Sequence, residues 1–293
     1  ILESLSNNAG FEKFNYIVYQ DGLSRNDQCY LEEHKNIPVI WENFVNNSKI
    51  EISDFIQSKY NIGLRDSIVS GISEVFIKYQ AAIILEDDLV LHQDFLKIMT
   101  ELIIAHKDNK NIGHINAWAP PAVIKSKYDT IIKTNMMFCW GWATWNDRWK
   151  EFPDKKNFKR FPLNNYKSLS LDFFGLALFR RQLSSNFNKT QRTWAVFWYW
   201  FLRNNKLKCI GPNHSLVKNI GNDGTGENCS KIKFSNRIQE NFDGRIEFST
   251  KVNFKNTYIY DLFFKIRIYR WLIFRNIILI NRKIKTFLEK IND

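Results

Sequence analysis

The chain contains few of the residues that usually mark a redox centre, a zinc site or a disulfide framework. Its 293 residues include four cysteines, Cys29, Cys139, Cys209 and Cys229, and no two of them lie close together in the sequence. The five histidines are equally dispersed, without an HExxH or comparable ligand spacing. Scattered cysteines fit a reducing compartment, where thiols serve as small apolar side chains. The sequence therefore gives no indication of a zinc knuckle or a redox motif.

Long uncharged apolar runs are missing as well. None approaches the ~20 residues that a membrane-spanning helix needs, so no transmembrane segment is predicted. No signal peptide is visible, and the sequence opens on Ile1 rather than methionine, so we expect the start of the natural chain to be absent. A hydrophobic fraction of 44% and an aromatic fraction of 15% indicate a folded globular protein, one large domain or a domain with an appendage.

Acidic residues are too few to balance the basic ones, and the excess is concentrated at the C-terminus. Residues 245–293 hold eleven Lys or Arg against four Asp or Glu, which is +7 of the net charge of +12. From residue 262 to 287, apolar residues recur every three or four positions, with basic residues between them. This pattern predicts basic amphipathic helices that lie on a membrane surface; the alternative is packing on the domain's own core or on a partner. Because the basic residues lie on an amphipathic tail, a nucleic-acid partner is disfavoured.

The stretch at residues 81–91 organises the rest of the chain. Apolar residues from Ala81 to Leu85 lead directly into Glu86, Asp87 and Asp88, after which the apolar character resumes. A short apolar run with polar boundaries is typical of a strand that is buried on both faces. Three adjacent carboxylates repel one another, so a divalent cation or basic side chains must offset their charge. The alternative interpretation is a solvated acidic turn.

Strands and helices are expected to alternate over the first 110 residues. The pattern predicts strands at 14–19 and 37–41, and helices near 25–35, 68–79 and 94–106. Such alternation indicates βαβ units and a parallel sheet, whose first strand would precede Ile1. The acidic residues would then lie at the carboxyl edge of the sheet, where open α/β folds bind ligands. Asp21 follows another presumed strand and would face the same edge, although an Asp that opens an Asp-Gly turn is the alternative.

The second half of the chain is more aromatic and less regular. Strands are predicted at 112–118 and 133–139, followed by four tryptophans within residues 140–149 and an aromatic helix at 193–202. Tryptophan faces are suitable for stacking on sugar rings, although most tryptophans in proteins simply pack in the core. Residues 221–226, Gly-Asn-Asp-Gly-Thr-Gly, form a polar loop long enough to act as a lid. We therefore divide the chain into residues 1–110, 111–243 and the tail 244–293.

These motifs together resemble the N-acetylglucosaminyltransferase I family of GT-A glycosyltransferases over roughly residues 1–230. The similar segments are Val18-Tyr19-Gln20-Asp21, the helix that contains Gly71, the acidic stretch 81–88 with the helix that follows it, and Gly141-Trp142. The segments Trp-Gly-Trp-Ala-Thr-Trp and Pro-Asn-His-Ser-Leu-Val-Lys-Asn-Ile-Gly-Asn-Asp-Gly-Thr-Gly are more similar to bacterial relatives that build surface polysaccharides.

The resemblance implies a GT-A fold, that is, an α/β, Rossmann-like fold with a mostly parallel sheet, and a nucleotide-diphospho-sugar donor. By carry-over, one residue binds the metal, Mn²⁺ or Mg²⁺, and others lie near the base, the ribose or the sugar. The implied metal ligand is Asp88, the residues at the base are Asp21 and Arg65, and those near the ribose and sugar are Glu86 and Asp87. Trp142 and Trp194 are expected to bind the acceptor. The alternative for Arg65 is a salt bridge to Asp66.

Two positions depart from the family's pattern. The family's catalytic base is an Asp directly after a Trp, and the matching position here, after Trp194, is Ala195. An inverting transfer needs a carboxylate that takes the proton of the acceptor hydroxyl, so Asp223 and Glu227 are the preferred substitutes, ahead of Asp147. The bacterial relatives tend to have His where this chain has Asn228, which leaves a metal or phosphate contact there in question.

We therefore predict a metal-dependent, inverting hexosyl- or N-acetylhexosaminyltransferase for which a UDP-sugar is the favoured donor. The acceptor would be a glycan or a lipid-linked glycan of bacterial surface polysaccharide synthesis, and the enzyme would be cytoplasmic, peripheral on the inner membrane face. A sugar nucleotidyltransferase and a non-catalytic glycan- or membrane-binding descendant remain as alternatives. A nucleotidyltransferase would need a Gly-rich, basic phosphate loop. The non-catalytic descendant stays open because Ala195 occupies the position of the family's catalytic base.

Overall fold

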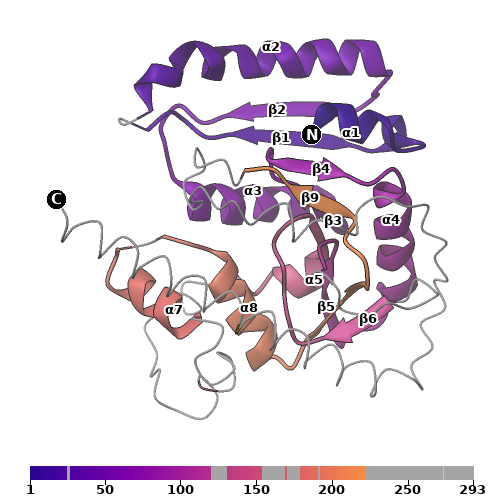
Figure 1. Cartoon of the computed structure of the whole chain (residues 1–293), viewed down its shortest axis with the longest axis vertical. Helices are drawn as coiled ribbons and strands as arrows, with labels where there is room; N and C mark the ends of the chain where they lie inside the picture. The colour runs from indigo at the N-terminus through magenta and orange to yellow at the C-terminus, as the bar shows by residue number, and fades with distance from the viewer. Residues whose placement is uncertain are drawn as a thin grey trace, which may run out of the picture.

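The computed structural model describes residues 1–24, 27–119, 131–153, 179–190 and 192–221, together with the single positions 169 and 273. Helices and strands alternate through most of the first half (Figure 1). In chain order the elements are α1 (Leu2–Ser6), η1 (Phe11–Lys13), β1 (Tyr16–Gln20), η2 (Gln28–Tyr30), α2 (Leu31–Ser48), β2 (Ser53–Gln57), α3 (Leu64–Lys78), β3 (Ala81–Ile84), β4 (Leu89–Leu91), α4 (Phe95–His106), β5 (Ile112–Asn116), β6 (Ile131–Thr134), β7 (Trp142–Trp145), α5 (Asn146–Trp149), α7 (Phe179–Phe187), α8 (Ala195–Asn204), β8 (Lys208–Pro212) and β9 (Val217–Asn219).

The largest sheet has the strand order β3-β7-β5-β8-β6. Strand β7 is antiparallel to both of its neighbours, β5 is parallel to β8, and β6 is antiparallel to β8. Strands β3, β5 and β8 therefore run in the same direction. Two further pairs are the parallel β1-β2 and the antiparallel β4-β9. The protein is thus a mixed α/β structure, and the expectation of a mostly parallel sheet is replaced by one of mixed direction.

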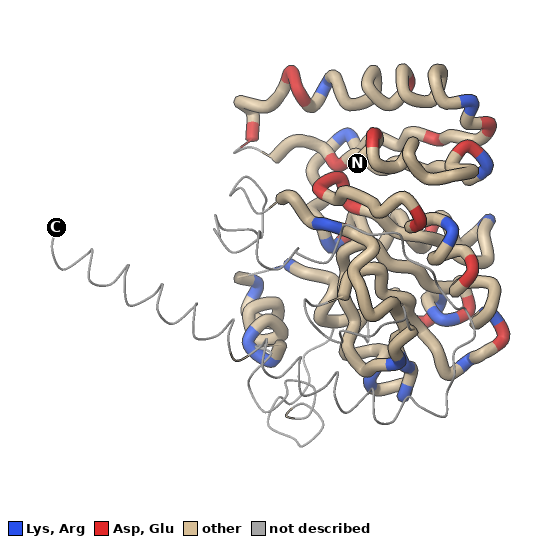
Figure 2. The backbone as a smooth tube through the Cα atoms, turned by 45° about the vertical axis from the view of Figure 1, so that its right-hand side comes forward, with Lys and Arg blue, Asp and Glu red and all other residues tan. Residues whose placement is uncertain are grey.

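Helices cover both faces of the five-stranded sheet. On one face, toward α3 and α8, the core includes Ile72, Trp142 and Trp198; on the other, toward α1 and α4, it includes Met99 and Ile115. Figure 2 shows that charged residues lie mainly on the outer helices and loops, and strands β5 and β7 contain no Lys, Arg, Asp or Glu. Helix α2 lies along β1 and β2 at one end of the molecule, with α7 and α8 toward the other (Figure 1).

The strand predicted at 37–41 is wrong, because these residues lie inside helix α2 and the second strand is β2. Ile37, Trp41 and Phe44 are spaced three and four residues apart, and the Trp41 ring packs on those of Tyr16 and Phe44. Pro38 lies inside the helix and has no N–H for the carbonyl of His34. A side chain of β1 supplies the missing donor, so the helix continues through the proline.

The organising stretch forms two short strands with the acidic residues between them. Strand β3 precedes Glu86, Asp87 and Asp88, as predicted, and β4 follows them. All four residues of β3 are half-buried, so the expectation that both of its faces are buried is wrong. Leu89 and Leu91 of β4 are almost completely buried, which fixes the chain on the C-terminal side of the acidic residues.

Helices α3 and α4 confirm the helices predicted near 68–79 and 94–106, because each has a regular apolar stripe, whereas the helix predicted near 25–35 is replaced by α2, which begins only at Leu31. Ile72 and Phe76 of α3, and Phe95, Met99 and Leu102 of α4, are buried. Within the described part of the chain, no helix is both long and apolar enough to cross a membrane. The tail 244–293 lies outside the described residues except for position 273.

Candidate functional site

Three loops meet at the edge where β3, β5 and β8 end. Residues 86–88 follow β3, Ala117 follows β5, and residues 213–216 follow β8. The backbone N–H of Leu216 donates to the carbonyl of Ala117 at 2.9 Å, and that of His92, just after β4, donates to the carbonyl of Leu216 at 2.9 Å. The carboxyl edge is thereby closed into one hydrogen-bonded unit, and the acidic residues belong to it.

Asp88 is the best-defined side chain of this edge. Its Oδ2 accepts a hydrogen bond from Nδ2 of Asn219 at 2.7 Å, and its carbonyl accepts from the backbone N–H of Ile220 at 2.8 Å. Strand β4 pairs with β9 in a register that places Leu89 opposite Asn219. The other carboxylate oxygen, Oδ1, is buried and has no hydrogen-bond partner among the described residues. One oxygen is therefore held, while the other is buried without a hydrogen bond from the described residues.

The electrostatics of the acidic residues favour a cation. Burial, and to a lesser extent the nearby charges of Asp88 and Asp87, together raise the pKa of Glu86 to about 7. Burial also raises the pKa of Asp88, against the lowering effect of the bond from Asn219. The pKa of a carboxyl rises when its charged form is poorly solvated or repelled, so a cation here would stabilise the ionised forms. The described residues contain no group of three or more His, Cys, Asp or Glu placed to hold a metal ion.

Asp21 is engaged with its own neighbourhood. Its Oδ1 accepts from the backbone N–H groups of Gly22 and Ile62, both at 2.9 Å, and its Oδ2 accepts from that of Gly63 at 2.8 Å. The carboxylate thus holds the turn that leads into α3, and the Gly22 bond agrees with the alternative of an Asp that opens an Asp-Gly turn. Contact of Asp21 with a nucleotide base stays a prediction.

Arg65, the second residue of α3, lies beside Asp66, the salt-bridge partner that is the alternative to a nucleotide contact. Its Nε is 3.6 Å from Oδ1 of Asp66, and its guanidinium lies 5.8 Å from the centre of the Phe197 ring. Asp66 also accepts a hydrogen bond from Arg192. Arg65 is therefore part of an Arg-Asp-Arg group at the start of α3, and its contact with a nucleotide also stays a prediction.

The two tryptophans expected to bind the acceptor lie in the core instead. Trp142 is 0% exposed and Trp194 is 2% exposed, and their rings stack with centroids 5.2 Å apart. Trp142 also stacks on His114, with centroids 4.9 Å apart. Neither indole has an exposed face for a sugar ring, so the interpretation of both residues changes from acceptor binding to packing. Sequence alone does not reveal which tryptophans of a rich segment are buried.

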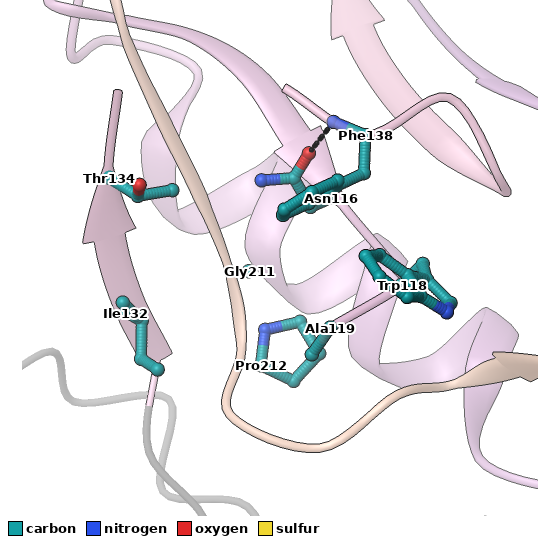
Figure 3. A pocket seen from close by; sticks show the side chains of 8 residues that line it. All are labelled: Asn116, Trp118, Ala119, Ile132, Thr134, Phe138, Gly211 and Pro212. Carbon is teal, nitrogen blue, oxygen red and sulfur yellow. Dashed lines mark hydrogen bonds between the residues drawn. The ribbon is translucent and has the colours of Figure 1, made fainter. Parts of the chain in front are cut away.

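A different aromatic group adjoins the carboxyl edge. Trp118, the second residue after β5, makes edge contacts with Phe138 and Trp140, with centroids 4.7 and 5.1 Å apart. Next to it is a small hollow, shown in Figure 3, with about 10 Å³ of free volume, room for about one water molecule. The hollow is lined by Asn116, Trp118, Ala119, Ile132, Thr134, Phe138, Gly211 and Pro212. The Asn116 amide orders this wall, because it accepts from the N–H of Phe138 at 2.7 Å and donates to the carbonyl of Met136 at 3.1 Å.

The candidates for the catalytic base lie in different places. Asp147 follows β7, and because Trp145 pairs with Ala81, it lies at the opposite edge of the sheet from residues 86–88. It is paired there with Lys110, at 2.6 Å, and with Arg148. Asp147 is therefore not a base for chemistry at Asp88. The preferred candidates, Asp223 and Glu227, lie outside the described residues.

Two further residues of this edge had no assigned role in the sequence analysis. Asn219 holds the Asp88 carboxylate, and Gly221 lies so close to it that a Cβ at position 221 would overlap Oδ2 of Asp88. Both fall within the Pro-Asn-His-Ser-Leu-Val-Lys-Asn-Ile-Gly segment that supported the family resemblance. Only the pairing of β4 with β9 reveals their function, since it brings together residues that are 131 positions apart.

Neither the scan against protein-family models nor the search of curated proteins finds a match to this chain. The residues and geometry of the carboxyl edge are therefore the basis for assigning a function.

Proposed function

We propose that the protein is a metal-dependent, inverting glycosyltransferase with a GT-A fold. It would transfer a hexosyl or N-acetylhexosaminyl group from a nucleotide-diphospho-sugar, with a UDP-sugar favoured, to a glycan or lipid-linked acceptor in surface polysaccharide synthesis. The single observation that carries the proposal is the Asp88 carboxylate, with one oxygen fixed by Asn219 and the other buried without a described partner. Its position at the carboxyl edge, in the loop between β3 and β4, is where α/β folds bind nucleotides.

The chemistry of this group fits Mn²⁺ or Mg²⁺ better than a softer metal. Carboxylate oxygens suit hard cations, which commonly take only one or two protein carboxylates and complete their shell with water and phosphate oxygens. The absence of a larger ligand group among the described residues is compatible with that mode of binding. When bound, such an ion would offset the charge of the leaving diphosphate. Asp88 would hold it, and Glu86 and Asp87 would lie beside the ribose and sugar of the donor.

The remaining roles follow from proximity and charge. Arg65 and Asp21 both adjoin the turn at the start of α3, which we assign to the nucleotide base. Asp223 or Glu227 would take the proton of the acceptor hydroxyl, because the chain has Ala195 where the similar family has its base. Positioning of donor and acceptor and electrostatic help to the leaving group would supply most of the rate enhancement.

The location is also part of the proposal. The basic, amphipathic pattern of residues 244–293 supports a cytoplasmic enzyme that is peripheral on the inner membrane face, where lipid-linked acceptors are found. Anionic lipid, rather than nucleic acid, is the partner that such a tail favours.

Ala195 favours a second candidate, a descendant that binds a glycan or a membrane but transfers no sugar. Asp88→Ala separates the two: an enzyme would lose donor hydrolysis and transfer, whereas a binding protein would keep its affinity for glycan. A nucleotidyltransferase receives no such support from the described residues, where no Gly-rich, basic phosphate loop is found.

The proposal is tested by thermal unfolding with UDP, GDP or CMP, each with and without Mn²⁺. At a ligand concentration of about 100 times Kd, binding stabilises the folded state by about 2.7 kcal/mol, which corresponds to a rise in Tm of roughly 5–10 °C for a domain of this size. We expect a metal-dependent rise with one nucleotide, its loss in Asp88→Asn, and its retention in Glu42→Gln, which removes the same charge from an exposed position of α2. The absence of any shift in the unmodified protein would exclude the transferase.

A further inference from the structure

We infer that Asn219 is a positioning residue for the metal-binding carboxylate, acting through Asp88 rather than on the ion or the substrate. The inference rests on the proposed function, because it assigns a task to Asn219 at the same site. It concerns residues of strand β9, far along the chain from the acidic stretch that the sequence marks as the site.

The orientation of the Asn219 amide is fixed from both ends. Its Oδ1 accepts from the backbone N–H of Gly221 at 3.0 Å, and its Nδ2 donates to Oδ2 of Asp88 at 2.7 Å. A backbone N–H is always a donor, so the oxygen of the amide must face Gly221 and the NH₂ group must face Asp88. The side chain is buried, with 2% exposure, so water does not compete for either bond.

This arrangement distinguishes the two oxygens of Asp88. Oδ2 is held by a buried donor, and Oδ1 is left as the buried oxygen without a described partner. A carboxylate held in this way is prepared to give one oxygen to a cation without first losing the freedom to rotate. Hydrogen bonds of this kind to ligating carboxylates orient the ligand, and their removal typically weakens metal binding by 10- to 100-fold.

The backbone around Asn219 supports the same geometry. The N–H of Ile220 donates to the carbonyl of Asp88 at 2.8 Å, so the segment that follows β9 is tied directly to Asp88. Gly221 then leaves room for the carboxylate, since a Cβ there would overlap Oδ2 of Asp88. The β4-β9 pair therefore sets the carboxylate by three means: a side-chain bond, a backbone bond and a missing side chain.

The competing account is that Asn219 only joins β9 to β4. Val217 provides the matched control, because it lies on the same strand, pairs with Leu91, is 1% exposed and makes no hydrogen bond to Asp88. Val217→Ala removes buried apolar surface, so it should lower Tm without changing the carboxylate. If Asn219 only holds the two strands together, its variants should likewise lower Tm without a separate effect on the carboxylate.

The test is a titration of the protein with Mn²⁺, with UDP present, followed by the electron paramagnetic resonance signal of the free ion. It is applied to the unmodified protein, Asn219→Ala, Asn219→Leu, Gly221→Ala and Val217→Ala, with Tm recorded for each. We expect Mn²⁺ affinity to fall at least 10-fold in both Asn219 variants and in Gly221→Ala, and to change less than twofold in Val217→Ala. Gly221→Ala keeps the Asn219 amide and places a Cβ against the Asp88 carboxylate, so it checks separately that the position of this carboxylate governs Mn²⁺ affinity, and Asn219→Leu repeats the Asn219 test with a side chain of similar size.

The outcomes separate the inference from the proposed function. If the unmodified protein binds Mn²⁺ and both Asn219 variants bind it equally well, the positioning role is overturned and the transferase proposal stands, whatever Gly221→Ala does. If affinity falls in Val217→Ala as much as in Asn219→Ala, Asn219 is only a structural tie and the inference is again overturned. If the unmodified protein binds no Mn²⁺ with UDP, GDP or CMP, the proposed function fails and the inference fails with it.

Discussion

Gln20 donates its side-chain Nε2 to the backbone carbonyl of His34 at 2.7 Å, across the contact between β1 and α2. That carbonyl would normally accept from the N–H four residues later, and that residue is Pro38, which has none. The Gln20 side chain is itself buried, with 7% exposure, and its Oε1 accepts from Nε2 of Gln57 at 3.1 Å. A side chain of strand β1 thus supplies the hydrogen bond that Pro38 removes from helix α2.

This relationship predicts strong coupling between Gln20 and Pro38. Gln20→Ala leaves the His34 carbonyl without a donor and should lower the free energy of unfolding by about 1–3 kcal/mol. In a Pro38→Ala background the restored N–H satisfies that carbonyl, so Gln20→Ala should then cost about 1 kcal/mol less. Urea unfolding of the four proteins of the double-mutant cycle measures the difference. Equal costs in the two backgrounds would show that the bond does not compensate for the proline.

The same residues explain why the sequence predicts a strand at 37–41 where the structure has a helix. Pro-Val-Ile-Trp has the β-branched and aromatic composition of a strand, and an internal proline normally argues against a helix. The deciding contact lies with Gln20, which is distant in sequence and not visible from a local pattern. Helix α4 shows the reverse case: its apolar stripe from Phe95 to Leu102 has helical spacing throughout, and its position was predicted nearly to the residue.

The candidate site was predictable to a similar extent. Carboxylates directly after an apolar run are a local signal, so the position of residues 86–88 followed from the sequence. The Asn219 contact depends on β4 pairing with β9, which no periodicity reveals. Trp142 and Trp194 were misassigned for a related reason, since a tryptophan that stacks on a sugar and one that stacks on another tryptophan belong to the same residue type.

Glu86 gives a pH-dependent prediction for the metal-free protein. Its pKa is raised from the ordinary 4.5 to about 7, mainly by burial, so the folded state binds the proton more tightly than the unfolded state. The associated stability is complete below pH 4.5 and is lost as the pH rises through 7, on the order of 3 kcal/mol in total. Glu86→Gln removes this loss and should make the protein more stable than the unmodified one at pH 8, with little difference near pH 4.5.

The measurement is urea unfolding in EDTA at a series of pH values for the two proteins, with Glu42→Gln as the control for loss of one negative charge at an exposed site. The control should follow the pH dependence of the unmodified protein. Parallel curves for Glu86→Gln and the unmodified protein between pH 4.5 and 8 would contradict the raised pKa.

The hydrogen bonds of Arg148 give a prediction for the edge of the sheet opposite the candidate site. Its guanidinium donates to the carbonyls of His106, Lys107 and Asn109, where α4 ends, and to that of Ile112, and it is only 5% exposed. A lysine has a single ammonium and cannot reproduce this fork of donors. Arg148→Lys should therefore destabilise the fold by about 2–4 kcal/mol, since buried carbonyls lose their donors.

Because Arg148 lies far from Asp88 along the sheet, the affinity for nucleotide and Mn²⁺ should be unchanged when Arg148→Lys is assayed well below its Tm. Calorimetric unfolding and the Mn²⁺ titration together check both parts. A loss of affinity without a loss of stability would place Arg148 in the functional site instead.

The protonation of His114 makes the stability of the aromatic core depend on pH. Its Nδ1 accepts from the Nε1–H of Trp198 at 3.1 Å, so its Nε2 carries the proton that is donated to the carbonyl of Phe138 at 3.1 Å. Burial lowers its pKa from 6.5 to about 3, so the folded state favours the neutral ring, and the stability this provides is present above pH 6.5 and is lost as the pH falls toward 3. His114→Phe keeps the ring stacked on Trp142 but leaves two buried groups unpaired, so it should cost about 2–5 kcal/mol at pH 7.5 and a smaller amount at pH 4.5. Urea unfolding at the two pH values measures the difference. If the cost is the same at both, His114 does not titrate with folding, and its contribution lies in its hydrogen bonds alone.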